Sequence, residues 1–546
     1  MTRKLVTLIA FAASLTISLF ANPAKRQFDV LIRNATVIDG NGTKGHIADV
    51  AVQGSRIVAV EKDSKLSGRM TIDAAGLVLA PGFIDLHNHS EVAISTPAGH
   101  LNEGFVRQGV TTIVGGPDGS RSPAQIRDLV AKYRANRVAT NVAFYVGHNA
   151  IRLEVMGTHQ RRAPTADEMG RMKQLVREGM ELGAIGFSSG VMYAPGIYST
   201  TDEIAELAKE VNPYGGMYDT HVRDPHEHLL ESNAEAIDIG RRAGIPVKLT
   251  HLTTPGLLHK GEMHDVVKQI EQARQQGINV VSDQYPYTAV ATTTLLGALV
   301  FDEVLKLDTV EDRVAALKDP KKLAKIRKDT VEGPDVGISL YRTAGPKHFE
   351  ILACSDCRQS EGKFISQIAD ELRVDPFDAM VGLLLQYKQP IIISVGGFFE
   401  DDVRYLMPQS WNMIASDGNA VTDASRAPFG WPHPRSTGTY PRVLGRYVRD
   451  LKLLTLEDAI RKMTSMPADF AGFSDRGRIA VGQFADLVVF DPNTIIDRST
   501  WESPMTFPIG VVDVFVNGTP VLLDRKMTGA MPGVYVRKEK SSPMIP

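Results

Sequence analysis

Eight short apolar segments alternate with longer segments of helical character between about residues 81 and 471. Strands that alternate with helices are typical of βα units, whose strands pair in parallel. Eight such units predict an α/β fold, a (β/α)8 barrel of the TIM type, in which catalytic side chains gather at the carboxyl ends of the strands. The eight segments are 83–87, 110–114, 142–147, 184–189, 217–221, 247–251, 278–283 and 413–417.

A long interval separates the seventh of these segments from the eighth. It contains charged sequence of helical character, such as residues 311–328. We therefore expect an insertion or lid at about residues 290–400.

The two ends of the chain share a different pattern, in which short β-rich runs are closed by turns. The runs near the amino end are 28–40 and 49–60, and those near the carboxyl end are 485–492 and 511–518. The simplest topology joins both ends in one small β-sandwich domain, made of residues 22–80 and 472–546. The barrel of residues 81–471 would then be inserted between them.

Residues 1–21 have the features of an export signal. Arg3 and Lys4 precede an apolar stretch over residues 5–20, and small residues follow before Asn22-Pro23. A buried helix or a membrane anchor would also be apolar, but the positive start, the terminal position and the proline favour a cleaved signal. We expect export to the periplasm or the medium, with no membrane span after removal of the signal, because no later stretch is long and apolar enough.

The charge balance excludes some classes of partner. Lys and Arg number 61 against 63 Asp and Glu, and the isoelectric point is near 6.7. The chain therefore has no basic field for nucleic acid, and we expect a small substrate. The oligomeric state is left open by the sequence.

The chain has two cysteines, Cys354 and Cys357. A single C-x2-C pair is half a zinc site, and a disulfide across so small a loop contributes little stability. We expect two isolated thiols or one minor disulfide.

Histidines stand at the ends of three predicted strands and an aspartate at the end of a fourth. His87 and His89 end the first strand and point to the same side, because strand side chains alternate. His221 ends the fifth strand, His251 the sixth and Asp417 the eighth. Imidazole and carboxylate are ligands of zinc and related divalent metals. We therefore predict that these side chains bind one or two zinc ions per chain, in preference to the alternative that the histidines only pack in the core. Asp417 is followed by a glycine, so this pair of residues also suits a turn.

Several motifs resemble those of the amidohydrolase superfamily, and more narrowly its N-acyl-D-amino-acid deacylase (D-aminoacylase) branch. The superfamily motifs are 81–89 (PGFIDLHNH), 220–224 (THVRD), 283–287 (DQYPY) and 416–418 (SDG). The branch is indicated by 432–435 (PHPR), 438–445 (GTYPRVLG) and the stretch 478–492. The resemblance covers nearly the whole chain after the predicted signal.

The resemblance implies hydrolysis of an amide that joins an acyl group to a D-amino acid, by attack of a zinc-bound hydroxide. His221 and His251 would hold the more tightly bound zinc, while His87, His89 and Asp417 would surround the second position. Asp417 would act as general base and acid. Arg435 would bind the substrate carboxylate and Tyr193 would lie near it. The substrate is expected to be an N-acyl-D-amino acid or a short peptide that contains a D-residue.

Two positions depart from the pattern of the branch. Its members usually carry a metal-binding cysteine after the second strand, where this chain has Asp118. A carboxylate can bind or bridge zinc, but the run 117–119 also suits a simple turn. A lysine that helps to hold the carboxylate usually follows the sixth-strand histidine by two residues, where this chain has Thr253. Lys248 on the same strand is no obvious substitute.

Two alternative functions remain at this stage. One is a hydrolase of cyclic amides or dipeptides on the same barrel. Ser188 and Ser189 stand at the fourth strand end in place of a lysine available for carbamylation, and this argues against the cyclic-amide type. The other is an inactive metal- or ligand-binding barrel. Such a protein would not need the complete set of histidines and Asp417, so the presence of the set argues against it.

Overall fold

The computed structural model describes residues 27–62, 65–157, 161–256, 261–301, 307, 309–335, 337–397, 399–420 and 432–538. The predicted export signal lies outside these residues. Within them, no helix has both the length and the apolar character needed to cross a bilayer.

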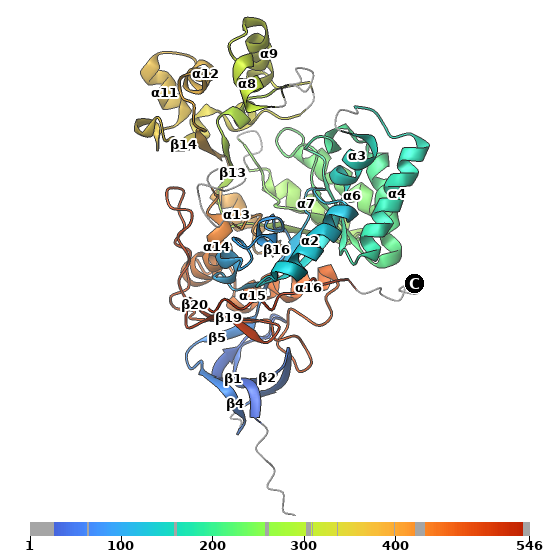
Figure 1. Ribbon diagram of the computed structural model, residues 1–546, viewed down its shortest axis with the longest axis vertical. Coiled ribbons are helices and arrows are strands. Elements are labelled where there is room, and N and C mark those ends of the chain that lie inside the picture. Colours follow the sequence, from blue (N-terminus) through green and yellow to red (C-terminus); the bar gives the residue numbers. More distant parts are fainter. Residues whose placement is uncertain are drawn as a thin grey trace, which may run out of the picture.

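The central element is a parallel sheet of eight strands in sequential order, from β6 to β12 and then β16 (Figure 1). A parallel bridge between Asn88 and Gly418 brings its first and last strands together. The predicted barrel is confirmed, with strands β6 (Phe83–Asp85), β7 (Val110–Gly115), β8 (Asn141–Gly147), β9 (Gly186–Gly190), β10 (Met217–His221), β11 (Val247–Leu249), β12 (Val280–Gln284) and β16 (Asn412–Ile414).

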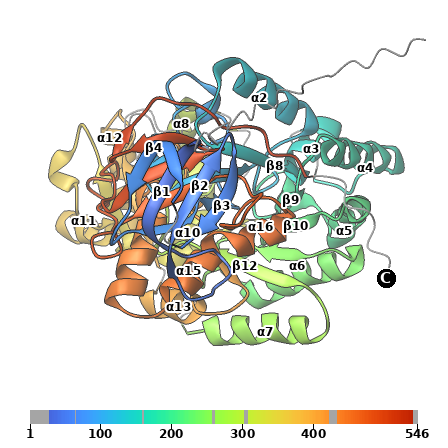
Figure 2. The same cartoon turned by 90° about the horizontal axis from the view of Figure 1, so that it is seen from below.

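Helices between the strands cover the outside of the barrel, and α2, α4, α5, α6 and α7 lie along one side of it in Figure 2. α4 buries Met172, Val176 and Met180, which recur at helical spacing. A capping box at Thr165 and Glu168 begins this helix. The helices are α1 (Glu103–Val106), α2 (Pro123–Asn136), α3 (His148–Met156), α4 (Ala166–Glu181), α5 (Thr201–Ala208), α6 (Leu229–Ala243), α7 (Met263–Gln275), α13 (Glu400–Leu406), α14 (Arg435–Arg442), α15 (Leu456–Met463) and α16 (Ser465–Ala471).

The two ends of the chain meet in one mixed sheet of nine strands. β17 pairs antiparallel with β5, so the carboxyl-terminal strands continue the amino-terminal ones. Alternate residues of these strands, such as Val30, Ile32, Leu487 and Val489, form a separate apolar core. The small β domain predicted from both ends is thus confirmed, with strands β1 (Gln27–Val37), β2 (His46–Gln53), β3 (Arg56–Glu61), β4 (Ser67–Asp73), β5 (Val78–Pro81), β17 (Leu487–Phe490), β18 (Val511–Val516), β19 (Thr519–Leu523) and β20 (Lys526–Met527).

A lobe with its own core is inserted between β12 and β16, at the end of the molecule opposite the mixed sheet (Figure 1). Phe349, Ile351, Phe377 and Ile393 are fully buried in that core. Cys354 and Cys357 form a disulfide within the lobe. Its elements are strands β13 (Ala289–Thr294), β14 (Phe349–Ala353) and β15 (Ile392–Gly396) and helices α8 (Val310–Ala316), α9 (Pro320–Val331), α10 (Leu340–Ala344), α11 (Ile365–Leu372) and α12 (Pro376–Gln386).

Candidate metal centre

All six predicted metal ligands lie at or just after the carboxyl ends of barrel strands. His87 and His89 follow β6, His221 ends β10, and His251 follows β11. Parallel strands of a barrel end on the same face, so these imidazoles converge. Asp118 follows β7 and Asp417 follows β16. The structure therefore brings together residues that are up to 330 positions apart in the sequence.

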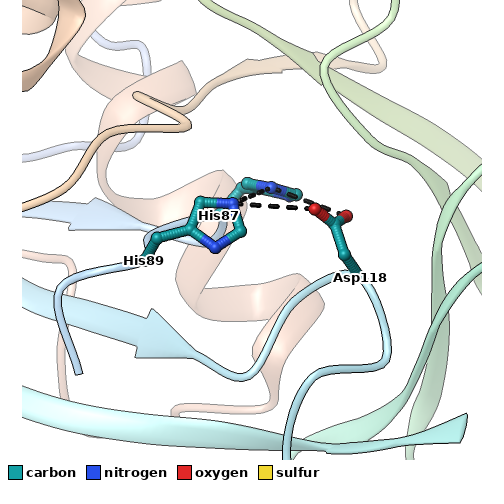
Figure 3. Close-up of side chains that lie close together, drawn as sticks. All are labelled: His87, His89 and Asp118. Atoms are coloured by element: carbon teal, nitrogen blue, oxygen red, sulfur yellow. Dashed lines mark hydrogen bonds and ion pairs between the residues drawn. The ribbon is translucent and has the colours of Figure 1, made fainter. Parts of the chain in front are cut away.

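The first part of the cluster contains His87, His89 and two carboxylates. The Nε2 atoms of the two histidines are 3.2 Å apart. Oδ1 of Asp417 lies 3.4 Å from Nε2 of His87 and 3.2 Å from Nε2 of His89. Asp118 faces the same pair, with oxygens 3.8 Å from Nε2 of His87 and 3.6 Å from Nε2 of His89 (Figure 3).

The second part of the cluster contains His221 and His251. Nδ1 of His221 is 2.8 Å from Nε2 of His251, and the Tyr193 hydroxyl is 3.4 Å from the same Nδ1. Three sets of ligand atoms lie within 4.8 Å of one another: His87, His89 and Asp118; His87, His251 and Asp417; and Asp118, His221 and His251. Because the sets share members, all of these residues belong to one cluster of candidate ligands.

Three of these residues have a left-handed backbone. The φ angles are 55° at Asp118, 36° at His251 and 51° at Asp417. This conformation is uncommon outside glycine, and strain of this kind concentrates at functional sites. Each of them lies two or three residues past the end of its strand, and its side chain faces the cluster.

The charges of the site favour a cation. Burial alone would lower the pKa of His87, but Asp118 and Asp417 raise it to about 9. Burial lowers the pKa of His221 to about 3, with His251 contributing, and that of His251 to about 4. His221 and His251 are therefore neutral near pH 7 and have lone pairs for a metal, while the two carboxylates attract positive charge.

The donor set fits a divalent metal such as zinc. It consists of imidazole nitrogens and carboxylate oxygens at compatible distances. One oxygen of Asp118 is buried and hydrogen-bonds no other described residue. A buried carboxylate oxygen needs a partner, and a metal would supply one. The roles of the six residues as ligands remain predictions.

A buried ionic network lies directly beneath the cluster, and sequence reasoning did not find it. The Lys248 ammonium is 2.7 Å from Oδ1 of Asp219, 3.0 Å from Oγ1 of Thr250, and also pairs with Asp283. Thr250 in turn contacts Nδ1 of His87. The Asp283 carboxylate accepts a hydrogen bond of 2.5 Å from the backbone N–H of His251. Lys248 is thus part of the support of the site and is not exposed to substrate.

A cavity of about 900 Å³ opens above the cluster. Its lining includes Asp118, Tyr193, His221, Thr253 and Arg435, together with Leu340 of the inserted lobe.

The Arg435 guanidinium borders this cavity. Its Nη1 lies 2.8 Å from Oδ2 of Asp417, and the group stacks over the Tyr285 ring at 4.7 Å. Tyr285 belongs to the 283–287 motif, but only the structure shows that its ring supports the arginine.

Comparison with known proteins agrees with this site. A family model described as "Amidohydrolase family" matches residues 70–329 and 366–522. The D-aminoacylase of Alcaligenes xylosoxydans xylosoxydans is 33% identical over 528 residues, which cover 93% of this chain and 97% of that protein. The chain belongs to the amidohydrolase family, in its D-aminoacylase branch.

Other similar proteins are also D-aminoacylases or N-acyl-D-amino-acid deacylases by name. The N-acyl-D-glutamate deacylase of the same organism is 31% identical over 95% of this chain and 98% of its own. A crystal structure of D-aminoacylase is similar with a TM-score of 0.74 at 33% identity, over 93% of this chain and 100% of that one.

The N-acyl-D-glutamate deacylase from Bordetella bronchiseptica, solved with zinc and a phosphonate inhibitor, has a TM-score of 0.75 at 28% identity. That similarity covers 94% of this chain and 100% of the other. The protein is thus a metal-dependent amidohydrolase that acts on carbon–nitrogen bonds.

Proposed function

We propose that this amidohydrolase cleaves the amide between an acyl group and a D-amino acid, in an N-acyl-D-amino acid or a peptide that contains a D-residue. One observation carries the proposal. The Arg435 guanidinium and the Asp417 carboxylate lie side by side at the edge of the histidine cluster. In an N-acyl amino acid only one carbon separates the carboxylate from the scissile nitrogen. Such a substrate can reach both groups at once. The D configuration is supported by the names of the relatives.

The residues that would hold the metal are His87, His89, Asp118, His221 and His251, with Asp417. A divalent metal bound there lowers the pKa of a bound water and polarises the amide carbonyl. The chain's own contribution is to orient these imidazoles and carboxylates, to bind the substrate carboxylate and to move protons.

Asp417 is placed to move the protons. Burial would raise the pKa of Asp417, but Arg435 together with His87 and His89 holds it well below its usual range. The free enzyme therefore keeps Asp417 as an anion. When Arg435 binds the substrate carboxylate, its charge is shared with a second anion and the proton affinity of Asp417 rises. Asp417 can then take a proton from the attacking water and deliver it to the departing amine nitrogen.

Arg435 suits the carboxylate because its planar fork can pair with two oxygens. The Tyr285 ring beneath it holds the plane of the guanidinium. Thr253 borders the same cavity in place of the branch lysine and can offer only a neutral hydroxyl. Carboxylate binding therefore depends on Arg435 more than it would with a second cation.

A cyclic-amide hydrolase is less well supported. Ser188 in the middle of β9 donates to the Gly116 carbonyl at 2.7 Å and accepts from the Gly119 N–H at 3.1 Å. The neighbouring Ser189 is 2.6 Å from the Tyr218 hydroxyl. These serines stabilise the strand ends and supply no group that could be carbamylated.

The test is a panel of N-acyl-D-amino acids, their L-enantiomers and D-containing dipeptides, assayed with the zinc-loaded enzyme. We expect turnover of D-substrates that is lost with a chelator. Stoichiometric zinc without turnover of any amide would favour a binding protein and contradict the proposal.

Asp417→Asn tests the proton transfer separately. We expect a loss of about 100-fold or more in kcat with the fold intact. Asp497→Asn is a matched control, because Asp497 pairs with Arg442 at 3.0 Å in a similarly buried setting outside the cluster. Wild-type turnover in Asp417→Asn would rule out the proton-transfer role.

A further inference from the structure

A buried histidine, His433, lies in the wall of the cavity, two residues before Arg435. Nδ1 of its ring accepts a hydrogen bond of 3.0 Å from the backbone N–H of Arg435. Nε2 of the same ring lies 3.3 Å from the carbonyl oxygen of Ala289, the first residue of β13. His433 therefore joins the residue expected to bind the substrate carboxylate to the first strand of the inserted lobe.

The two partners of the His433 ring determine its tautomer. A carbonyl oxygen can only accept, so Nε2 carries the hydrogen, and a backbone N–H can only donate, so Nδ1 keeps its lone pair. Burial, with a contribution from the charge of Arg435, lowers the pKa of His433 well below its usual value. The ring is therefore neutral, and its contact with Ala289 keeps the acceptor nitrogen turned toward Arg435.

The beginning of α14 depends on this acceptor. Arg435 is the first residue of the helix, and the N–H groups of a first helical turn have no carbonyl partner within the helix. Pro434 occupies the capping position but has no polar side chain that could accept a hydrogen bond. His433 provides the acceptor with its ring, and its carbonyl oxygen accepts from the N–H of Ser436 at 3.0 Å. His433 thus fixes the backbone of Arg435.

The His433 ring also supports the charged end of Arg435. It packs edge to face with the Tyr285 ring, with centroids 5.8 Å apart, and Tyr285 in turn carries the guanidinium at 4.7 Å. Trp501 of the small β domain contacts His433 in the same edge-to-face way at 4.5 Å. The barrel, the inserted lobe and the small β domain therefore all contact this one histidine, and it holds both ends of Arg435.

We infer that His433 is a positioning residue for substrate binding, and that its Nδ1 atom places Arg435 for the substrate carboxylate. A guanidinium fork pairs well with both carboxylate oxygens when its position is set before the substrate arrives. Loss of the acceptor at His433 lets the first turn of α14 shift, which weakens carboxylate binding and leaves the metal ligands in place. This inference rests on the proposed function and adds to it a residue that does not touch the substrate carboxylate itself.

The test compares an N-acyl-D-amino acid with its carboxamide as substrates of the zinc-loaded enzyme. His433→Leu removes both ring nitrogens and keeps an apolar side chain. We expect this variant to lose about 10-fold or more in kcat/KM on the carboxylate substrate, mainly through KM, and less than about 3-fold on the carboxamide. Its zinc affinity in a chelator competition should equal that of wild type, because both ring nitrogens of His433 are bonded to backbone groups outside the metal centre.

Further variants separate positioning from a general role in packing. His433→Asn returns an acceptor oxygen that can bond the N–H two residues on, so we expect its kcat/KM on the carboxylate substrate to stay within about 3-fold of wild type. His433→Gln keeps a donor toward Ala289 but no acceptor near the place of Nδ1, and it should repeat the loss of His433→Leu. In the Arg435→Met background, His433→Leu should cost less than about 3-fold, because the group that it positions is gone.

His148→Gln is the matched control for His433→Gln. His148 is fully buried, and its ring nitrogens lie 3.3 Å from Oδ1 of Asn149 and 2.9 Å from Oε1 of Glu203. Its loss should affect stability but leave the ratio of kcat/KM on the carboxylate and carboxamide substrates unchanged.

The outcomes separate the two proposals. If wild type turns over neither substrate, or if Arg435→Met leaves its preference for the carboxylate unchanged, the proposed function is overturned and this inference with it. If Arg435→Met removes the preference but His433→Leu and His433→Gln lose equally on both substrates, only the role of His433 is overturned. Equal losses in His433→Asn and His433→Leu would also overturn it, as would a full loss in the Arg435→Met background. So would a fall in zinc affinity in His433→Leu, which would show that the substitution disturbs the whole site.

Discussion

The ionic network beneath the metal centre gives a sharp test of how the barrel supports its site. Lys248 is fully buried and contacts Asp219, Asp283 and Thr250. Burial lowers the pKa of Lys248, but the two carboxylates raise it well above its usual value, so Lys248 is a cation. Lys248→Met removes this cation and keeps a side chain of similar length. It leaves Asp283 as an uncompensated buried charge.

The expected cost is large. Removal of one partner of a buried ion pair costs about 3–5 kcal/mol. Burial raises the pKa of Asp219, whereas Lys248 and the His251 N–H help to hold that of Asp283 below its usual value. Asp219 can thus take up a proton when Lys248 is lost, and most of the penalty comes from Asp283.

Urea unfolding of the metal-free protein, followed by circular dichroism, measures this cost. We expect the free energy of unfolding to fall by about 3–5 kcal/mol in Lys248→Met. Adding Asp219→Asn and Asp283→Asn to this variant should recover part of the loss, because the orphaned charge is removed. A change below about 1 kcal/mol in Lys248→Met would refute the account of the buried pair.

The same substitution should weaken metal retention. Lys248 holds Thr250, which contacts His87, and it holds Asp283, which binds the backbone of His251. Partners that orient metal ligands typically contribute about 10- to 100-fold in affinity. Competition with a chelator measures this effect independently of turnover, and unchanged zinc affinity would show that Lys248 supports only the fold.

Three further predictions concern single residues. Asp118→Ala should weaken zinc binding by at least about 10-fold in a chelator competition, and unchanged affinity would mean that the residue only forms a turn. Arg435→Met should lower kcat/KM by about 10- to 100-fold on substrates with a free carboxylate but not on their amides, and equal losses on both would contradict carboxylate binding. Burial lowers the pKa of Lys462 to about 8 from 10.5. Between these values the unfolded chain holds more protons than the native one, so the stability of wild type relative to Lys462→Met should rise with pH, by at most about 1.4 kcal/mol per unit. Unfolding titrations from pH 7 to pH 11 would contradict this if the difference stayed flat.

The barrel could be predicted from the sequence because its strands are buried and short, and helices separate them. Each predicted strand overlaps an observed one, as with 184–189 against Gly186–Gly190 of β9. Continuous apolar runs are the pattern of strands covered on both faces. The convergence of the histidines followed from the parallel topology alone, since strand ends of a barrel share one face.

The supporting contacts could not be predicted in the same way, because they join residues with no local relation. The backbone N–H of Ser416 donates to Asp85 at 3.0 Å, across 331 positions. Lys248 lies in the otherwise apolar strand β11, and its neighbours in the sequence do not indicate a role for it. Its two aspartates belong to other strands, and only the packed barrel shows that three charges face one another inside it.

For Asp118, the sequence and the structure have to be considered together. The sequence left it open as a ligand or as part of a turn, since aspartate suits both. The structure shows that the two are not alternatives. The turn over 117–120 gives Asp118 its φ of 55°, and this backbone aims the carboxylate at His87 and His89. A cysteine in the same turn would offer one soft sulfur, whereas the carboxylate offers two hard oxygens. We therefore expect Asp118 to shift the metal preference of this site away from soft ions.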